Sequence, residues 1–165
     1  MNTRLSHPLR FAVSMLLVAL CAQILPASAQ SPDGTISSTP QWSTDYEGTL
    51  KLSQETGKPV LVNFTGSDWC GWCVKLKKDL FETPGFVDYS NNALLLLEVD
   101  FPSRKPIDPA LAASNRKLAE AYGVEGFPTL VVLDGNGKEL GRHVGYFKGG
   151  VKAFSAYIQS LLPSS

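Results

Sequence analysis

The sequence predicts an α/β fold in which a central mixed sheet of four to five strands carries helices on both faces. Short, nearly continuous apolar runs at 60–64, 93–99 and 129–133 are typical of buried strands. Segments with apolar residues at helical spacing separate these runs. An Asp-Gly-Asn-Gly turn at 134–137 then joins the last two strands as a hairpin, so parallel and antiparallel pairs share one sheet.

The chain opens with the three-part pattern of a secretory signal peptide, which we place at residues 1–29. Two arginines give it a positive start, an apolar stretch covers 11–25, and small residues precede a cut after Ala29. The stretch is about fifteen residues long, which is short for a membrane span of roughly twenty. An uncleaved N-terminal anchor and a lipidated Cys21 are the alternatives. We expect an exported protein, either periplasmic or secreted.

Composition limits the class of protein that the chain forms after the leader. Residues 30–41 are rich in Ser, Thr, Pro and Gly and predict a flexible linker before a single domain at 42–165. The leader holds two of the 15 basic residues and none of the 15 acidic ones, so the rest carries a net charge of about −2. No basic patch argues for a nucleic-acid partner. We expect a monomer that is not inserted in a membrane once the leader is removed.

The first half of the domain begins with a helix expected over 42–56. Trp42, Tyr46 and Leu50 share one helical face because they are spaced by four residues, and Gly57 suits the end of the helix. The strand at 60–64 follows. Beyond it, apolar side chains on one side and lysines on the other predict a helix at 74–82 and then a shorter one at 86–91.

The second half alternates strands and helices. A second buried strand is expected at 93–99, followed by an ordered loop or insertion at 101–109 that contains three prolines. A helix at 109–122 precedes the hairpin of strands at 129–133 and 138–144. Inward-facing apolar residues at helical spacing predict a last helix at 151–162.

Two cysteines stand between the first strand and the following helix, in Trp69-Cys70-Gly71-Trp72-Cys73. With two residues between them, they can close a small disulfide ring or remain a dithiol. At the first turn of a helix, Cys70 faces unpaired backbone N–H groups and the positive end of the helix dipole. This position favours the thiolate, which is the nucleophilic form. The stretch therefore predicts thiol–disulfide exchange.

We expect Cys70 to attack a substrate disulfide and Cys73 to resolve the resulting mixed disulfide. The alternatives are a permanent disulfide and half of a zinc site. Zinc needs four ligands and His143 is the only histidine after the leader, so no metal site is predicted. Trp69 and Trp72 are expected to form an apolar docking surface for a partner peptide, and Trp69 also to pack over the active-site loop.

These residues carry a resemblance to the thioredoxin superfamily, which covers the chain from about 42 to 162. The cysteine pair comes after a strand, and Gly-Phe-Pro-Thr at 126–129, the turn at 134–137 and Val144-Gly145 come later in that order. The stretch 63–70 looks most like that of exported bacterial thioredoxin-like proteins. These are related to the C-terminal domain of the transmembrane disulfide reductases.

The resemblance implies a thioredoxin fold and a protein disulfide oxidoreductase that serves redox homeostasis. It needs no cofactor beyond a redox-active Cys70–Cys73 disulfide, and its partners are a disulfide-containing protein substrate and a redox partner protein. By the same resemblance Pro128 is cis and faces the cysteines, and Gly145 lies near the groove. The backbone of Phe127 would pair with an extended substrate chain.

The direction of electron flow stays open on the sequence alone. We expect a reductase or isomerase. The alternatives are a dithiol oxidase that introduces disulfides, and a non-enzymatic peptide-binding or chaperone-like module.

The chain departs from the family pattern in two respects. Members often have a buried acid in the strand before the motif and a lysine near it on the next strand, where this chain has Asn63 and Leu96. Asn63 cannot accept a proton, so assistance to the resolving cysteine must come from Asp68, Glu98 or water. A tryptophan also replaces the common proline between the cysteines, which changes the redox poise in a direction that the residues alone do not give.

Overall fold

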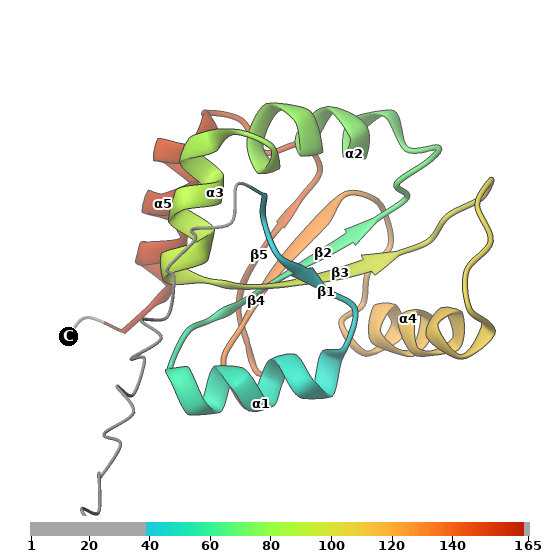
Figure 1. Ribbon diagram of the computed structural model, residues 1–165, viewed down its shortest axis with the longest axis horizontal. Helices are drawn as coiled ribbons and strands as arrows, with labels where there is room; N and C mark the ends of the chain where they lie inside the picture. Colours follow the sequence, from blue (N-terminus) through green and yellow to red (C-terminus); the bar gives the residue numbers. More distant parts are fainter. Residues whose placement is uncertain (1–38, 164–165) are drawn as a thin grey trace, which may run out of the picture. The chain divides into compact units, whose positions relative to one another are not determined.

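The computed structural model describes residues 39–163. The expected leader at 1–29, most of the linker at 30–41 and the last two residues of the expected domain lie outside this range. Within it, five strands form one sheet in the order β1-β3-β2-β4-β5 (Figure 1). The strands are β1 (Trp42–Ser43), β2 (Val60–Thr65), β3 (Leu95–Asp100), β4 (Thr129–Leu133) and β5 (Glu139–Val144).

The sheet is mixed, as the sequence predicts. β3 pairs in parallel with β1 and with β2, whereas β4 pairs antiparallel with β2 and β5 antiparallel with β4. The helices are α1 (Tyr46–Thr56), α2 (Gly71–Leu76), the π-helical turn η1 (Lys77–Phe81), α3 (Pro84–Ala93), α4 (Pro109–Ala121) and α5 (Gly150–Leu161). Helices α1 and α4 cover one face of the sheet and α2, α3 and α5 cover the other (Figure 1).

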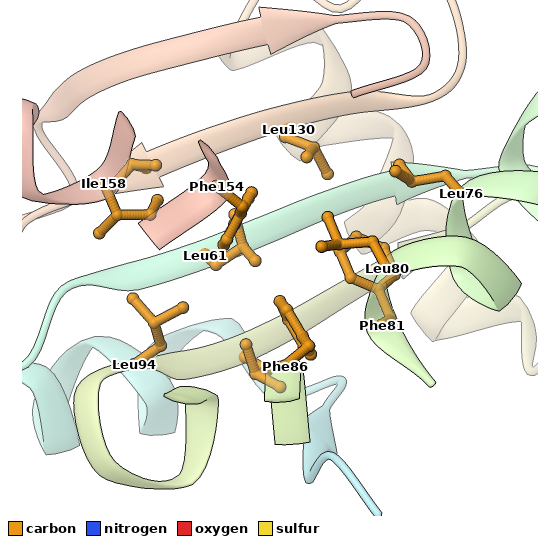
Figure 2. Close-up of a cluster of buried hydrophobic side chains, with 11 residues drawn as sticks. Leu61, Leu76, Leu80, Phe81, Phe86, Leu94, Leu130, Phe154 and Ile158 are labelled. Carbon is orange, nitrogen blue, oxygen red and sulfur yellow. The ribbon is translucent and has the colours of Figure 1, made fainter. Parts of the chain in front are cut away.

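Each face of the sheet has its own hydrophobic core. Along β2 the side chains alternate, with Leu61 in the core under α3 and α5 and Val62 in the core above α1 and α4. Figure 2 shows the first core, which includes Leu61 of β2, Leu130 of β4 and Phe154 of α5. The central strands β2 and β4 are therefore buried on both faces, whereas the edge strand β5 is partly exposed.

The start of the domain differs from the expectation. Trp42 is not helical: it lies in β1, pairs with Leu96 and packs edge-on against Phe81, with 5.1 Å between ring centroids. The helix begins only at Tyr46, because Asp45 is extended and its carboxylate accepts the backbone N–H of Gly48 at 3.0 Å. The expected shared face of Trp42 and Tyr46 is wrong, since the two residues serve opposite cores.

Two element boundaries also move. The expected strand at 93–99 runs from Leu95 to Asp100, because α3 continues through Ala93. The Thr-Pro-Gly break before α3 is at the same time its start, since the Thr83 hydroxyl accepts the backbone N–H of Phe86 and Pro84 opens the first turn. Between residues 39 and 163, no helix is long and apolar enough to cross a membrane.

Candidate active site

The cysteine pair lies where β2 passes into α2. Cys70 is the N-cap of α2 in an extended conformation, and its Sγ accepts the backbone N–H of Cys73 at 3.2 Å. The two residues are joined by a disulfide, with 5.2 Å between their Cα atoms. Cys70 is 7% exposed and Cys73 is 4% exposed, so the expected nucleophile is the more accessible of the two by a small margin. The same N–H would stabilise a thiolate at Cys70 after reduction.

Trp69 packs over the active-site loop, which is one of its two expected roles. Its indole N–H donates to the backbone carbonyl of Phe101 at 2.7 Å, which fixes the ring over the loop after β3. Its ring also meets that of Phe127 edge-on at 6.0 Å, and Phe127 stacks on Phe101 at 5.0 Å. About half of Trp69 stays exposed, so a held aromatic surface borders the cysteine pair.

Trp72 is the more exposed tryptophan, with 59% of its surface open. It contacts Tyr146 at 5.8 Å between ring centroids, and the Tyr146 hydroxyl donates to Asp79 at 2.7 Å. Lys75 lies 2.6 Å from the same carboxylate and 5.4 Å from the Tyr146 ring. The hydrogen bonds from Lys75 and Tyr146 lower the pKa of Asp79. Sequence reasoning missed Tyr146, although it directly follows the expected groove residue Gly145.

The Phe127–Pro128 peptide bond is cis, as the resemblance implies. The backbone N–H of Gly145 donates to the carbonyl of Pro128 at 2.8 Å, and Gly145 has a φ of 88°, which favours glycine. Because Phe127 contacts Trp69, this segment lies beside the motif. The structure thus brings together Trp69, Phe127, Pro128 and Gly145, while Trp72 joins them through its contact with Tyr146.

Asp68 does not cap α2. Its carboxylate instead accepts three backbone N–H groups of the loop after β3, at 2.7–2.9 Å, from Ser103, Arg104 and Lys105. These hydrogen bonds, that of Ser103 first, lower the pKa of Asp68. Asp100 adds a second tie by accepting the backbone N–H of Ser67 at 2.9 Å. The expected loop at 101–109 is therefore ordered and fastened to the active-site turn.

A cavity of about 290 Å³ borders Cys73 on the side of α2, η1 and the strands. Asn63 lines it, is 5% exposed, and its Oδ1 accepts no hydrogen bond from residues 39–163. Glu98 lines the same cavity, and burial together with the nearby charge of Asp100 raises the pKa of its carboxyl. Leu96, at the expected lysine position, is buried in the core.

Within the described part of the chain, no group of three or more His, Cys, Asp or Glu side chains is placed to hold a metal ion.

A disulfide at the start of a helix, beside a cis-proline loop on a mixed sheet, defines a protein of the thioredoxin-fold class. The chain belongs to the thioredoxin-like domain family, whose family model matches residues 46–161. Both the expected superfamily and the expected thioredoxin fold are thereby confirmed.

The relatives agree on the type of chemistry. The chain is similar to the disulfide bond reductase DsbH of Chlamydia pneumoniae, with 33% identity over 151 residues and 90% of each protein covered. A solved structure of a DsbH oxidoreductase has a TM-score of 0.71 at 33% identity and covers 81% of this chain and 92% of that one.

A more distant relative is the thiol:disulfide interchange protein DsbD of Pseudoalteromonas atlantica. It is 28% identical over 120 residues, which make up 72% of this chain but only 18% of DsbD. Together with the Cys70–Cys73 disulfide, these relatives support oxidoreductase activity and confirm the expected enzyme class.

Proposed function

We propose that this protein is a reductase of protein disulfides that acts outside the cytoplasm. The observation that carries the chemistry is the position of Cys70, whose Sγ caps α2 and receives a backbone N–H while bonded to Cys73. The direction is supported by the similarity to DsbH, a disulfide bond reductase, over 90% of both chains. The location is supported by the signal-peptide pattern at 1–29.

The reaction starts from the reduced pair. The Cys70 thiolate attacks one sulfur of the substrate disulfide, and the other substrate sulfur leaves as a thiolate that takes a proton from solvent. Cys73 then loses its proton and attacks the Cys70 sulfur, which closes the Cys70–Cys73 disulfide and releases the second substrate sulfur. Two electrons pass from the pair to the substrate, and a redox partner protein restores the dithiol.

The aromatic rim of the site, formed by Trp69, Trp72 and Phe127, supplies the docking surface for the substrate. Trp69 and Trp72 are each about half exposed on either side of Cys70, and exposed aromatic side chains anchor protein interfaces. The backbone at Phe127, next to the cis Pro128, lies beside Trp69 and offers its peptide groups to an extended substrate segment. A substrate strand seated there would place its disulfide against Cys70.

Trapping with the full exported chain tests this function. We expect Cys73→Ser to accumulate mixed disulfides with exported proteins, because the attacking thiol that resolves them is gone. Cys70→Ser, the matched control, should form none. A Cys73→Ser variant that forms no disulfide-linked adduct would overturn the proposed mechanism.

The reduction potential of the pair tests the direction. Titration against glutathione should give a value near that of thioredoxin, about −270 mV. A value of about −120 mV, as in a strong dithiol oxidant, would instead assign the oxidase reaction.

A further inference from the structure

We propose that Glu98 is the proton acceptor for the resolving thiol of Cys73, acting from β3 in place of an acid at Asn63 on β2. The proposal rests on the dithiol chemistry proposed above. It names a residue for the step in which Cys73 must lose a proton before it can attack the mixed disulfide.

Sheet register places Glu98 on the correct side. Asn63 and Glu98 are partners on the parallel strands β2 and β3, so their side chains point to the same face of the sheet. That face carries α2, the helix that holds Cys73. All three residues line the cavity of about 290 Å³, whereas Cys70 does not line it. The cavity therefore borders the resolving cysteine and not the nucleophile.

The interior of this cavity is polar enough to carry a proton relay. Asn63 is almost fully buried and its Oδ1 has no hydrogen-bond partner between residues 39 and 163. A buried acceptor of this kind is normally satisfied, and the cavity is large enough for water molecules that could do so. A water bound to Asn63 could link the Cys73 thiol to the Glu98 carboxyl.

The other carboxyl groups near the motif are already engaged. Asp68 is held by three backbone N–H groups of the loop after β3, and it does not line this cavity. Glu82 does line the cavity, but it is exposed and forms an ion pair with Lys77 at 3.9 Å. Glu98 carries a half-buried carboxylate on the cavity wall, where it is available to accept a proton.

Charges around Glu98 come from three elements. Asp100 lies on its own strand, Lys77 on η1 and Lys105 on the loop after β3. Burial, followed by Asp100, raises the pKa of Glu98, while Lys77 and Lys105 oppose the shift. A carboxyl group whose pKa moves toward neutrality is a better proton acceptor for a thiol than one at its ordinary value, because the two proton affinities become closer.

The proposed step conserves atoms and electrons. The Cys73 thiol gives its proton to the Glu98 carboxylate, directly or through one water. The Cys73 thiolate attacks the Cys70 sulfur of the mixed disulfide, and the substrate sulfur leaves as a thiolate that solvent protonates. The Glu98 carboxyl then returns its proton to solvent, so no further oxidant or reductant is needed.

Stopped-flow reaction of the reduced chain with 5,5′-dithiobis(2-nitrobenzoate) separates the two steps. Attack by Cys70 releases one coloured thiolate and forms the mixed disulfide, and attack by Cys73 releases the second. We expect Glu98→Gln to leave the first phase within about twofold of the unmodified chain. The second phase should slow by about tenfold or more at neutral pH, since general base assistance contributes factors of this order or larger.

Controls make the result specific. Glu82→Gln, at the rim of the same cavity, should change neither phase. The deficit of Glu98→Gln should shrink as the pH rises above about 8.5, the ordinary pKa of a thiol, because the proton is then lost to solvent without help. The unchanged first phase reports that the variant is folded.

Two outcomes have different meanings. A second phase that is unaffected by Glu98→Gln, or one slowed equally by Glu82→Gln, overturns the role of Glu98 and leaves the dithiol chemistry standing. A chain without the first phase, in which Cys70 releases no thiolate, overturns the proposed function itself.

Discussion

The aromatic packing around Phe154 of α5 allows the stability lost on truncating this side chain to be predicted with a magnitude. Phe154 is fully buried, and its ring lies 5.3 Å from Phe147, 5.6 Å from Phe86 and 6.5 Å from Tyr89, measured between centroids. Figure 2 shows it between β2 and the helices of the same core. Phe147 directly follows Tyr146, the residue that contacts Trp72, so this packing also supports the rim of the site.

Truncation by Phe154→Ala removes the whole ring. An aromatic side chain buries roughly 150 Å² or more, and at about 25 cal/mol per Å² the loss is about 4 kcal/mol. Measured Phe→Ala changes in cores span about 3–5 kcal/mol, which includes the cavity that remains. We therefore expect the free energy of unfolding to fall by about 4 kcal/mol, a large part of the total for a domain of this size.

Urea unfolding of the oxidised chain measures this loss as a lower midpoint at an unchanged slope. Phe154→Leu, which keeps much of the volume, should cost less than about 1.5 kcal/mol. Val144→Ala, at a position 65% exposed, should stay within about 0.5 kcal/mol of the unmodified chain. A loss below about 1.5 kcal/mol for Phe154→Ala would refute the packing of α5 against the sheet through this ring.

Two further predictions concern the rim of the site. Trp72→Ala should slow reduction of a protein disulfide about five- to tenfold, because the protein substrate docks on the indole. Reduction of a small disulfide, which does not dock there, should stay within about twofold. Equal slowing of both substrates in parallel rate measurements would contradict this prediction. Asp68→Asn should speed amide hydrogen exchange at residues 103–105, whose N–H groups it accepts. In the folded protein the pKa of Asp68 lies below its usual value of 3.8. Protection of these amides from exchange in the unmodified chain should therefore persist at any pH above 3.8. It should be lost as the pH falls through the pKa of Asp68 in the folded protein. Exchange that is independent of Asp68 and of acid would contradict the role of this carboxylate.

Local signals were enough for most of the fold. The runs that form β2 and β4 are continuous and apolar because both strands are covered on two faces. β1 could not be predicted in this way: it has only two residues, and what makes it a strand is its pairing with Leu96 and Leu97, more than fifty positions away in the sequence. The spacing of Trp42 from Tyr46 fits a helix by coincidence.

The candidate site shows the same contrast between features with a local sequence signal and features that depend on long-range contacts. The cysteine pair, both tryptophans and the cis-proline segment were predicted from the sequence, because each sits in or next to a recognisable motif. The tie between Asp68 and the backbone of residues 103–105 spans about 35 positions and uses main-chain donors, which have no signature in the sequence. Sequence reasoning offered Asp68 and Glu98 equally as helpers of Cys73; of the two, Glu98 lines the cavity that borders Cys73 and Asp68 does not.

The position proposed for the acid, at Glu98, can be tested by introducing a second carboxyl group at residue 63. In the substitution Asn63→Asp, a new carboxyl would be introduced on β2 opposite Glu98 of β3, across a strand spacing of about 4.8 Å. Two carboxylates separated by about 6 Å repel by about 3 kcal/mol at an effective dielectric constant of 20, which corresponds to about two pKa units. Repulsion raises the pKa of one of the pair and also opposes a thiolate at Cys73, so both effects act in the same direction.

We therefore expect the pH profile of the second stopped-flow phase to move upward by about one to two units in Asn63→Asp, while the first phase keeps its profile. Asn63→Ser, which removes the amide without adding charge, is the matched control and should leave the midpoint in place. If the midpoint of Asn63→Asp coincides with that of the control, the two strand positions do not share one electrostatic environment. In that case Glu98 cannot stand in for an acid at residue 63, and the cavity beside Cys73 serves some other purpose.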